Sequence, residues 1–142
     1  MTDLDLPDVN VLVALLHPAH VHHRIAREWF NANERFATTP ITESGFVRVG
    51  LNPTVAGASN SFAAVVASLK SLREQERAEF LPDDSTLAKL TFDSRGLTGF
   101  RQVTDFHLVN LAARHSACLV TFDQKISAVL MPDDRHLVRT LG

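Results

Sequence analysis

The sequence predicts an α/β fold with a central parallel sheet. Short apolar segments of strand length alternate along the chain with amphipathic segments of helix length, and this alternation favours parallel strands joined by helical crossovers. Residues 11–16 form an unbroken apolar run directly after Leu6-Pro7-Asp8, which is typical of a helix buried in the middle of a domain. A length of 142 residues suits one domain, residues 1–142, around a single core.

The composition excludes several classes of protein. The hydrophobic fraction of 45% is ordinary for a globular protein, and no apolar run reaches membrane-spanning length. The acidic N-terminus has no apolar signal core, and Cys118 is the single cysteine. We therefore expect a cytoplasmic protein in a reducing compartment, with Cys118 as a small core residue. A net charge of −2 indicates no bulk attraction to nucleic acid or membranes.

The first half of the chain predicts three helices and a strand. His17-Pro18 ends the first helix, and His20-Val21-His22-His23 leads into the second. The second helix has an apolar stripe made by Ile25, Ala26, Trp29 and Phe30. Residues 36–38 read as a strand. The third helix begins with Thr39 as N-cap and Pro40 at its first position, and it ends at Asn52-Pro53.

The second half continues the alternation. Residues 55–61 predict a loop, and a helix follows with an apolar stripe made by Phe62, Val65, Val66, Leu69 and Leu72. Its polar face, which we expect to be solvated, carries Lys70, Arg73, Glu74 and Arg77. Further strands are expected at residues 79–81, 118–121 and 137–140. Further helices are expected from Ser85 to Leu90, from Thr104 as N-cap, and over residues 126–130.

Four acids stand at junctions between these elements. Asp8 and Asp123 each end a strand, whereas Glu43 and Asp105 each begin a helix. Each has an ordinary explanation, because acids cap helices and stabilise their first turn. In a parallel sheet, however, all four would gather at one edge, where ligands bind. Carboxylates packed together retain protons unless a cation intervenes, and oxygen ligands suit magnesium or manganese.

These motifs identify a family resemblance that covers nearly the whole chain. The pieces are Asp8-Val9-Asn10-Val11-Leu12, Thr39-Pro40-Ile41-Thr42-Glu43, Val103-Thr104-Asp105 and Leu119-Val120-Thr121-Phe122-Asp123. In this order and at this spacing they resemble the PIN-domain nucleases, and most closely the VapC toxins of bacterial toxin–antitoxin pairs. The resemblance implies a three-layer α/β/α fold and cleavage of RNA that depends on Mg²⁺ or Mn²⁺. It also implies a homodimer and inhibition by a small VapB-like antitoxin.

The resemblance also assigns roles to residues. It implies that Asp8, Glu43, Asp105 and Asp123 are the catalytic and metal-binding acids, with Asn10 and Thr121 as polar residues that steady them. We expect the antitoxin to lie in a groove formed by the stripes around Trp29-Phe30 and Phe62-Val66. The basic residues that we consider as phosphate contacts, each equally explained as solvated surface charge, are Arg48, Arg95, Arg101 and Lys125.

Some residues depart from the family pattern or allow other readings. Pro7 stands where relatives have an aliphatic residue, so we expect a shortened first strand. Phe106-His107 replaces the more usual Ala-Tyr and could change the wall of the cleft. The His20–His23 cluster is a polar helix start or a metal site, and the resemblance assigns it no role.

Three alternative functions remain at this point. One is an RNA-processing nuclease that has no antitoxin. Another is a phosphatase with Asp8 as nucleophile and Asp133-Asp134 as a late acidic pair. The third is a non-catalytic RNA- or protein-binding module, which the presence of all four acids disfavours.

Overall fold

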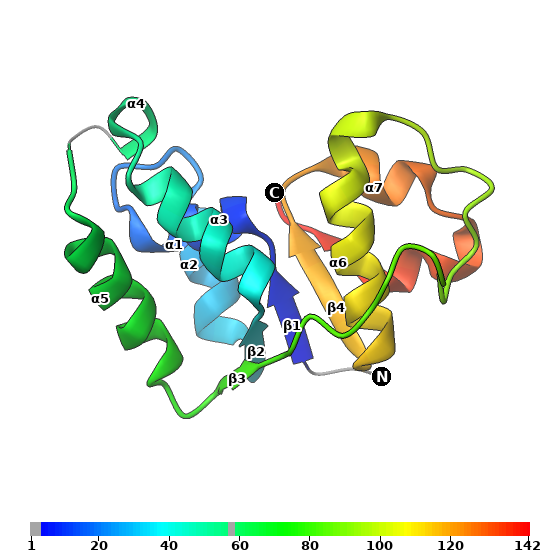
Figure 1. Ribbon diagram of the computed structural model, residues 1–142, viewed down its shortest axis with the longest axis horizontal. Helices are drawn as coiled ribbons and strands as arrows, with labels where there is room; N and C mark the ends of the chain where they lie inside the picture. The colour runs from blue at the N-terminus through cyan, green and yellow to red at the C-terminus, as the bar shows by residue number, and fades with distance from the viewer. Residues whose placement is uncertain (1–3, 57–58) are drawn as a thin grey trace.

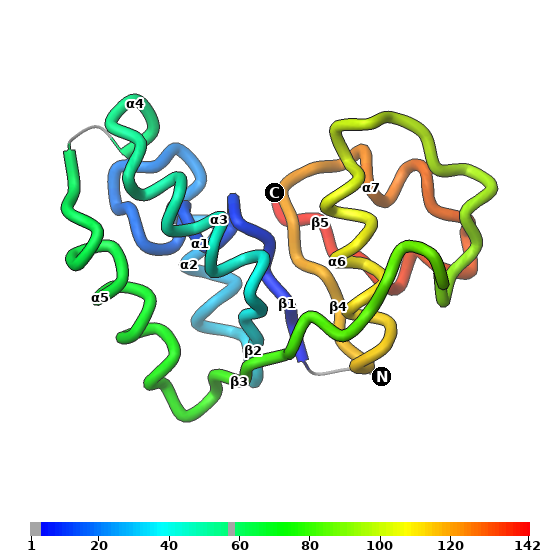
Figure 2. Tube along the Cα trace, viewed as in Figure 1, coloured from blue at the N-terminus to red at the C-terminus, as the bar shows by residue number. Residues whose placement is uncertain are grey.

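The computed structural model describes residues 4–56 and 59–142. Its strands are β1 (Leu4–Pro7), β2 (Arg35–Thr38), β3 (Ala78–Phe80), β4 (Ala117–Thr121) and β5 (Val138–Thr140). Its α-helices are α1 (Val9–Leu16), α2 (His23–Ala32), α3 (Pro40–Gly50), α4 (Pro53–Ala56), α5 (Phe62–Arg73), α6 (Val103–Arg114) and α7 (Gln124–Val129). Two 3-10 helices are η1 (Phe100–Gln102) and η2 (Pro132–Leu137). Figure 1 shows these elements, and Figure 2 follows the chain from one end to the other.

The described strands form one parallel sheet in the order β3-β2-β1-β4-β5. From the central β1 the chain builds outward through β2 and β3, then returns to the other side of β1 to form β4 and β5. The order therefore reverses between β1 and β4, which makes the carboxyl ends of these two strands the expected place for a ligand. The predicted parallel α/β sheet is confirmed.

Helices cover both faces of the sheet, which gives the three-layer α/β/α architecture (Figure 1). One apolar cluster joins α6 and α7 to strand residues such as Leu6 and Leu119. The other joins α1, α2, α3 and α5 to residues such as Phe36 and Val120. Neighbouring strand residues thus serve opposite clusters, because successive side chains of a strand point to opposite faces.

Pro7 does not interrupt the central strand. It ends β1 and stays in register with Val120 of β4, while among the described residues the pairing of β1 with β2 covers only Leu4 and Asp5. Pro7 is thus confined to the end of the strand, where a missing backbone donor costs least. Immediately after it, the Asp8 backbone N–H donates to the Val120 carbonyl at 2.9 Å.

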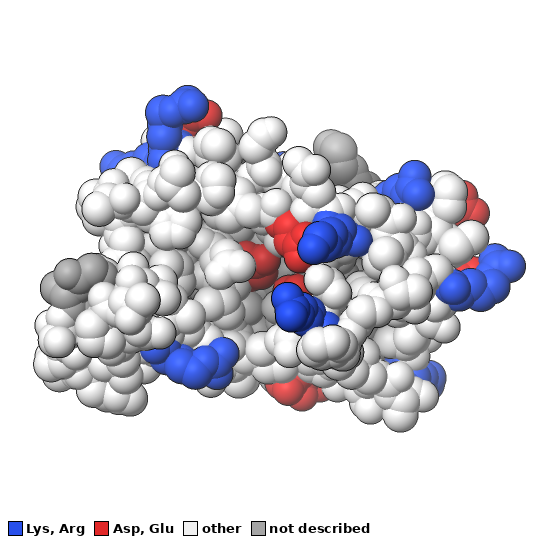
Figure 3. Space-filling view, turned by 90° about the horizontal axis from the view of Figure 1, so that it is seen from above, with Lys and Arg blue, Asp and Glu red and all other residues white. Residues whose placement is uncertain are grey.

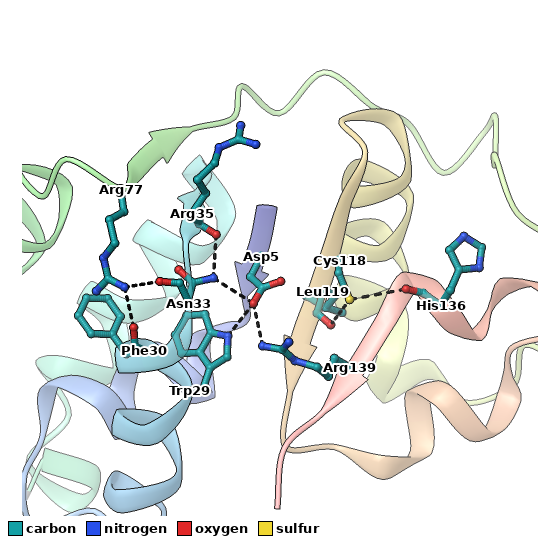
Figure 4. A network of polar contacts seen from close by, with 10 residues as sticks. All are labelled: Asp5, Trp29, Phe30, Asn33, Arg35, Arg77, Cys118, Leu119, His136 and Arg139. Carbon is teal, nitrogen blue, oxygen red and sulfur yellow. Dashed lines mark hydrogen bonds and ion pairs between the residues drawn. The ribbon is translucent and has the colours of Figure 1, made fainter. Parts of the chain in front are cut away.

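A buried carboxylate near the start of β1 ties three elements together (Figure 4). Asp5 is 6% exposed, and its Oδ2 accepts hydrogen bonds from Trp29 Nε1 at 2.7 Å and Asn33 Nδ2 at 3.1 Å. Arg139 of β5 donates to the same oxygen at 2.8 Å. Such a pair needs the additional donors, because attraction alone does not offset the desolvation of a buried charge. The network fixes α2 and β5 against β1.

The segment between β3 and η1 corrects one prediction. The expected helix from Ser85 to Leu90 is wrong, because the described residues 81–99 form neither helix nor strand. Side chains of α6 hydrogen-bond to backbone groups of this segment that no helix or strand pairs. The buried Asn110 accepts from the Thr91 N–H and donates to the Thr86 carbonyl.

The remaining differences concern helix ends and individual side chains. Residues 53–56 form the short helix α4 where a loop was expected, and residues 57–58 lie outside the described part of the chain. Thr104 is not an N-cap, because η1 runs directly into α6, which begins at Val103. Cys118 is half-buried rather than fully buried, and burial raises the pKa of its thiol to about 11.

Two arginines that we expected to be solvated are engaged in contacts. Arg77 lies over the Phe30 ring, with its guanidinium carbon 4.2 Å from the ring centroid, and donates to the Phe30 carbonyl at 2.7 Å. Arg73 lies over Phe80 and contacts Glu43. No helix in the described part of the chain is both long enough and apolar enough to cross a membrane.

Candidate active site

The predicted acids lie where the chain leaves the carboxyl edge of the sheet. Asp8 directly follows β1, and Asp123 follows β4 by two residues. Glu43 lies in the first turn of α3 and Asp105 in the first turn of α6. Figure 3 looks onto this edge and shows acidic side chains grouped near the middle of the face, with basic side chains beside them.

Asp8 is both a helix cap and a member of the site. Its Oδ1 accepts from the Val11 backbone N–H at 3.0 Å, which caps α1. Its Oδ2 accepts from the Thr121 hydroxyl at 2.6 Å. The side chain is 5% exposed, and this burial raises the pKa of Asp8 even though its hydrogen bonds act in the opposite direction. The two explanations of Asp8 therefore do not exclude each other.

Thr121 links two of the acids. Besides donating to Asp8, its Oγ1 accepts from the Asp123 backbone N–H at 3.0 Å. Thr121 is fully buried at the end of β4, so its rotamer is fixed by the strand. Asp123 in turn caps α7, with Oδ1 accepting from the Lys125 N–H at 2.9 Å. The Thr121 hydroxyl thus links the residue that follows β1 to the chain that follows β4.

Asp105 completes a group of three acids that repel one another. Its pKa is raised to about 6, first by partial burial and then by the negative charges of Asp8 and Asp123. Asp123 also raises the pKa of Asp8. The structure therefore brings Asp8, Asp105 and Asp123 into mutual electrostatic range.

Glu43 stands apart from these three aspartates. Its Oε2 accepts from the Thr38 hydroxyl at 2.6 Å, and Arg73 Nε lies 3.5 Å from the same oxygen. It also lines a groove between α3 and α5 with Val47, Leu51 and Phe62. Sequence reasoning missed both Thr38 and Arg73. Thr38 could have been found from its place at the end of β2, but only the packing of α5 brings Arg73 to Glu43.

The other polar residues singled out from the sequence have varied surroundings. Asn10 has an exposed side chain, and its backbone N–H hydrogen-bonds to Asp8. Phe106 is buried in the core and His107 contacts Asp83 at 2.6 Å. These contacts do not test whether the replacement of Ala-Tyr changes the wall of the cleft, which stays a prediction.

The histidines start α2 as polar residues. His20 Nδ1 accepts from the His22 N–H at 3.0 Å, and the His22 ring stacks on Phe122 with centroids 4.7 Å apart. His23 Nδ1 lies 2.8 Å from the Ala14 carbonyl oxygen. Burial and the neighbouring histidines lower the pKa of His20. These contacts support the reading as a helix start.

The basic candidates lie in three different places, and Arg48 lines the groove between α3 and α5 with Glu43. Arg95 is bound to Asp93, with Nε 2.9 Å from Oδ2, and lines a separate pocket with Asp133 and Asp134. Arg101 and Lys125 line one pocket together. The surroundings of Asp134 disfavour a phosphatase. Asp134 accepts from the Asp93 backbone N–H at 3.0 Å, and it is not among the groups that shift the pKa of Asp8.

The donor chemistry of the three aspartates fits a hard divalent cation, since carboxylate oxygens are the ligands that Mg²⁺ and Mn²⁺ prefer. Within residues 4–56 and 59–142, however, no three His, Cys, Asp or Glu side chains are close enough together to form a complete metal centre. The arrangement suits a cation held by one or two carboxylates and water, which is how Mg²⁺ is commonly bound.

Comparison with known proteins identifies the family of this chain. The family model of the PIN domain matches residues 6–129. Ribonuclease VapC38 of Mycobacterium tuberculosis is 47% identical over 120 residues, which cover 83% of this chain and 84% of the relative. Ribonuclease VapC39 of the same organism is 42% identical over 125 residues, which cover 86% of this chain and 90% of the relative.

Solved structures share the fold at low identity. VapBC2 of Rickettsia felis, bound to a promoter DNA fragment, aligns with a TM-score of 0.62 at 15% identity and covers 98% of this chain and 99% of that one. VapC20 of Mycobacterium tuberculosis, a toxin that cleaves the sarcin-ricin loop, aligns with a TM-score of 0.60 at 12% identity and covers 87% of this chain and 93% of that one. The chain therefore belongs to the PIN domain family, and within it to the VapC ribonucleases.

Proposed function

We propose that this protein is the toxin of a VapBC-type pair, an endoribonuclease that requires Mg²⁺ or Mn²⁺. One observation carries the catalytic part of the proposal. Asp8, Asp105 and Asp123 meet at the carboxyl ends of the two strands where the sheet order reverses, and their charges raise the pKa of Asp105 to about 6. Buried like charges that are not neutralised are typical of catalytic and metal-binding sites.

In this mechanism one or two of the three aspartates would bind the cation directly, and the others would reach it through water. When bound, the cation neutralises the scissile phosphate and lowers the pKa of a bound water. Asp105, with its raised pKa, is best suited among the three to accept a proton near neutral pH. Thr121 fixes the carboxylate of Asp8 and orients the chain at Asp123. Glu43 acts through water, because Thr38 and Arg73 already engage its Oε2.

The antitoxin part of the proposal has a different structural basis. One solved structure that shares the fold is named as a VapBC complex, so we propose a VapB-like partner for this chain. Trp29 is buried and bonded to Asp5, and Arg77 covers Phe30, so that stripe packs inside the protein rather than forming the expected groove. The groove between α3 and α5 is a better candidate, because it is lined by Val47, Leu51 and Leu69, includes the exposed Phe62, and reaches Glu43.

A test of the partner uses a charge in that groove. Phe62→Asp should reduce copurification with the protein encoded beside the gene, whereas wild-type chain should retain it. The mass of the isolated chain in solution tests the proposed homodimer separately. If a neighbouring antitoxin gene is absent and expression leaves growth unaffected, the remaining candidate is an RNA-processing nuclease of the same family.

The nuclease itself is tested by mapping RNA 5′ ends after brief expression. Wild-type protein should produce new 5′ ends at defined sites, and Asp105→Asn should produce none although it folds normally by circular dichroism. In vitro, cleavage should require Mg²⁺ or Mn²⁺ and stop with chelator. Full activity in chelator would refute the metal mechanism.

A further inference from the structure

An exposed aromatic ring stands at the start of the helical segment that carries Asp105. Phe100 is 83% exposed, whereas the aromatic residues of the core are covered. It starts η1, which runs without a break into α6, the helix that carries Asp105 in its first turn. A large exposed apolar side chain is informative when it lies next to a functional site.

The backbone before Phe100 is built for this projection. Gly99 has a φ of 89°, in the region that favours glycine. A Cβ added at Gly99 would lie 2.6 Å from the Gln102 side-chain oxygen. The Gln102 oxygen ends a flexible side chain that can move, so the positive φ is what favours glycine at the turn that presents the ring.

Phe100 is one wall of a pocket with basic residues. The pocket has a volume of about 330 Å³ and is also lined by Thr98, Arg101, Lys125 and Val129. This lies at the small end of the range for ligand pockets, roughly 300–1,000 Å³. The Arg101 guanidinium carbon lies 5.7 Å from the centroid of the Phe100 ring, so the pocket combines an aromatic face with two positive charges.

The pocket is connected to the acids on both sides. Phe100 and Arg101 precede Asp105 on one continuous helical segment. Lys125 follows Asp123, and its N–H donates to Asp123 Oδ1 at 2.9 Å. An RNA strand whose phosphate lies at the aspartates would therefore pass this pocket with an adjacent nucleotide.

We propose that Phe100, together with Arg101 and Lys125, forms a subsite that stacks one unpaired base of the RNA substrate next to the cleaved bond. The inference rests on the proposed function. Exposed aromatic rings beside basic side chains are the usual means of binding single-stranded nucleic acid, because every base has a face for stacking and every nucleotide a phosphate. A protein partner would leave the pairing of this ring with two cations beside the acids unexplained.

The test combines a protein variant with a substrate variant. The probe is a single-stranded oligoribonucleotide that spans the mapped cleavage site, with an abasic residue introduced at each position in turn. Phe100→Ala should lower kcat/KM on the intact RNA about 5-fold to 100-fold, mainly through KM, which is the range for loss of one stacked base. An abasic residue at one position should lower kcat/KM of the wild type by a similar factor and should hardly lower kcat/KM of Phe100→Ala.

Five further variants make the interpretation specific. Phe100→Trp should restore kcat/KM, because it keeps a stacking face, whereas Phe100→Leu should not. Leu87→Ala removes another exposed apolar side chain, 42% exposed in the segment before η1, and should leave kcat/KM unchanged. Arg101→Ala and Lys125→Ala should each reduce the salt dependence of binding by a slope of about 0.7.

Each other outcome overturns the inference in a distinguishable way. Wild-type protein could cleave the RNA while the losses of kcat/KM caused by Phe100→Ala and by every abasic position multiply, as independent effects do. In that case the stacking subsite is wrong and the proposed function stands. Unchanged cleavage with altered antitoxin affinity or oligomer mass would make the pocket a protein interface. If the wild type cleaves no RNA with Mg²⁺ or Mn²⁺, both the proposed function and the subsite fail.

Discussion

Asp5 and Asp8 lie three residues apart on the same central strand segment and are almost equally buried, at 6% and 5% exposed. Asp5 is surrounded by donors, and Trp29, Asn33 and Arg139 all contact its Oδ2 (Figure 4). Asp8 has its cap and Thr121, but the charged groups that act on it are other acids. The fold surrounds one oxygen of the first carboxylate with three donors and leaves the second carboxylate in repulsion with other acids.

This difference agrees with the separate roles that the proposed function gives to the two acids. Burial of a charge costs several kcal/mol unless partners offset it, and like charges kept together are typical of functional sites. Asp5 holds elements together, whereas the proposal assigns Asp8 to a site that a cation would occupy.

The largest expected effect is the difference in RNA cleavage between the Asp8 and Asp5 variants. Asp8→Asn should reduce RNA cleavage more than about 100-fold, because loss of even outer-shell support around a metal costs about 10–100-fold. Asparagine keeps the helix cap, so the folded protein should persist. Asp5→Asn is the matched control, and its kcat per folded molecule should equal that of the wild type. Equal losses in both variants would erase the distinction.

In stability, Asp5→Asn should have the larger loss of the two variants. Asp5→Asn should lower the free energy of unfolding by about 1–3 kcal/mol, since it weakens three hydrogen bonds that converge on a buried acceptor. Urea denaturation in chelator measures this. Arg139 is half exposed, which favours the lower part of the range. A metal-free Asp8→Asn protein less stable than Asp5→Asn would contradict our interpretation of Asp8.

The fold was largely predictable from the sequence. The apolar run before His17, the Thr39-Pro40 helix start and the strand at 118–121 depend on local patterns, and all three were found close to their expected places. The helix expected after Ser85 was wrong because the segment is held by Asn110 from a distant helix. Such non-local hydrogen bonds leave no periodic signal.

The site was predictable in its residues but not in its grouping. Four acids at element junctions suggested one cluster, yet the structure links only three through their charges, and Glu43 contacts Thr38 and Arg73. Arg73 looked like a solvated residue because its helical spacing places it on a polar face. Only the packing of α5 beside α3 reveals its contact with Glu43.

The raised pKa of Asp105 predicts a pH dependence of metal binding. At the value of about 6, protons compete with the cation below pH 6, so affinity for Mn²⁺ should fall by up to about tenfold per pH unit there. Calorimetric titration at pH 5, 6 and 7 measures this. In the metal-free protein, lower pH should instead favour the folded state through this group. Because the folded pKa lies above the unfolded value near 4, this group's contribution to stability is present below pH 4 and is lost as pH rises through about 6.

Asp105→Asn should flatten the metal profile near pH 6, whereas Asp93→Asn should leave it unchanged. Asp93 is a suitable control because it is a partly exposed acid outside the candidate site, and its pKa is lowered by its hydrogen bonds with Arg95. An unaltered profile in Asp105→Asn would show that another group titrates.

The most direct test of the central claim is the stability of Asp105→Asn with and without metal. The substitution keeps the shape of the side chain and removes one of three mutually repelling charges. In chelator the variant should be more stable than the wild type by about 1 kcal/mol, allowing for partial solvent screening. Added Mg²⁺ should shrink or reverse the difference, since the intact site gains more binding energy. If thermal melts instead show a less stable variant whose deficit is the same at every Mg²⁺ concentration, Asp105 is an ordinary helix-start acid and the charge cluster does not exist.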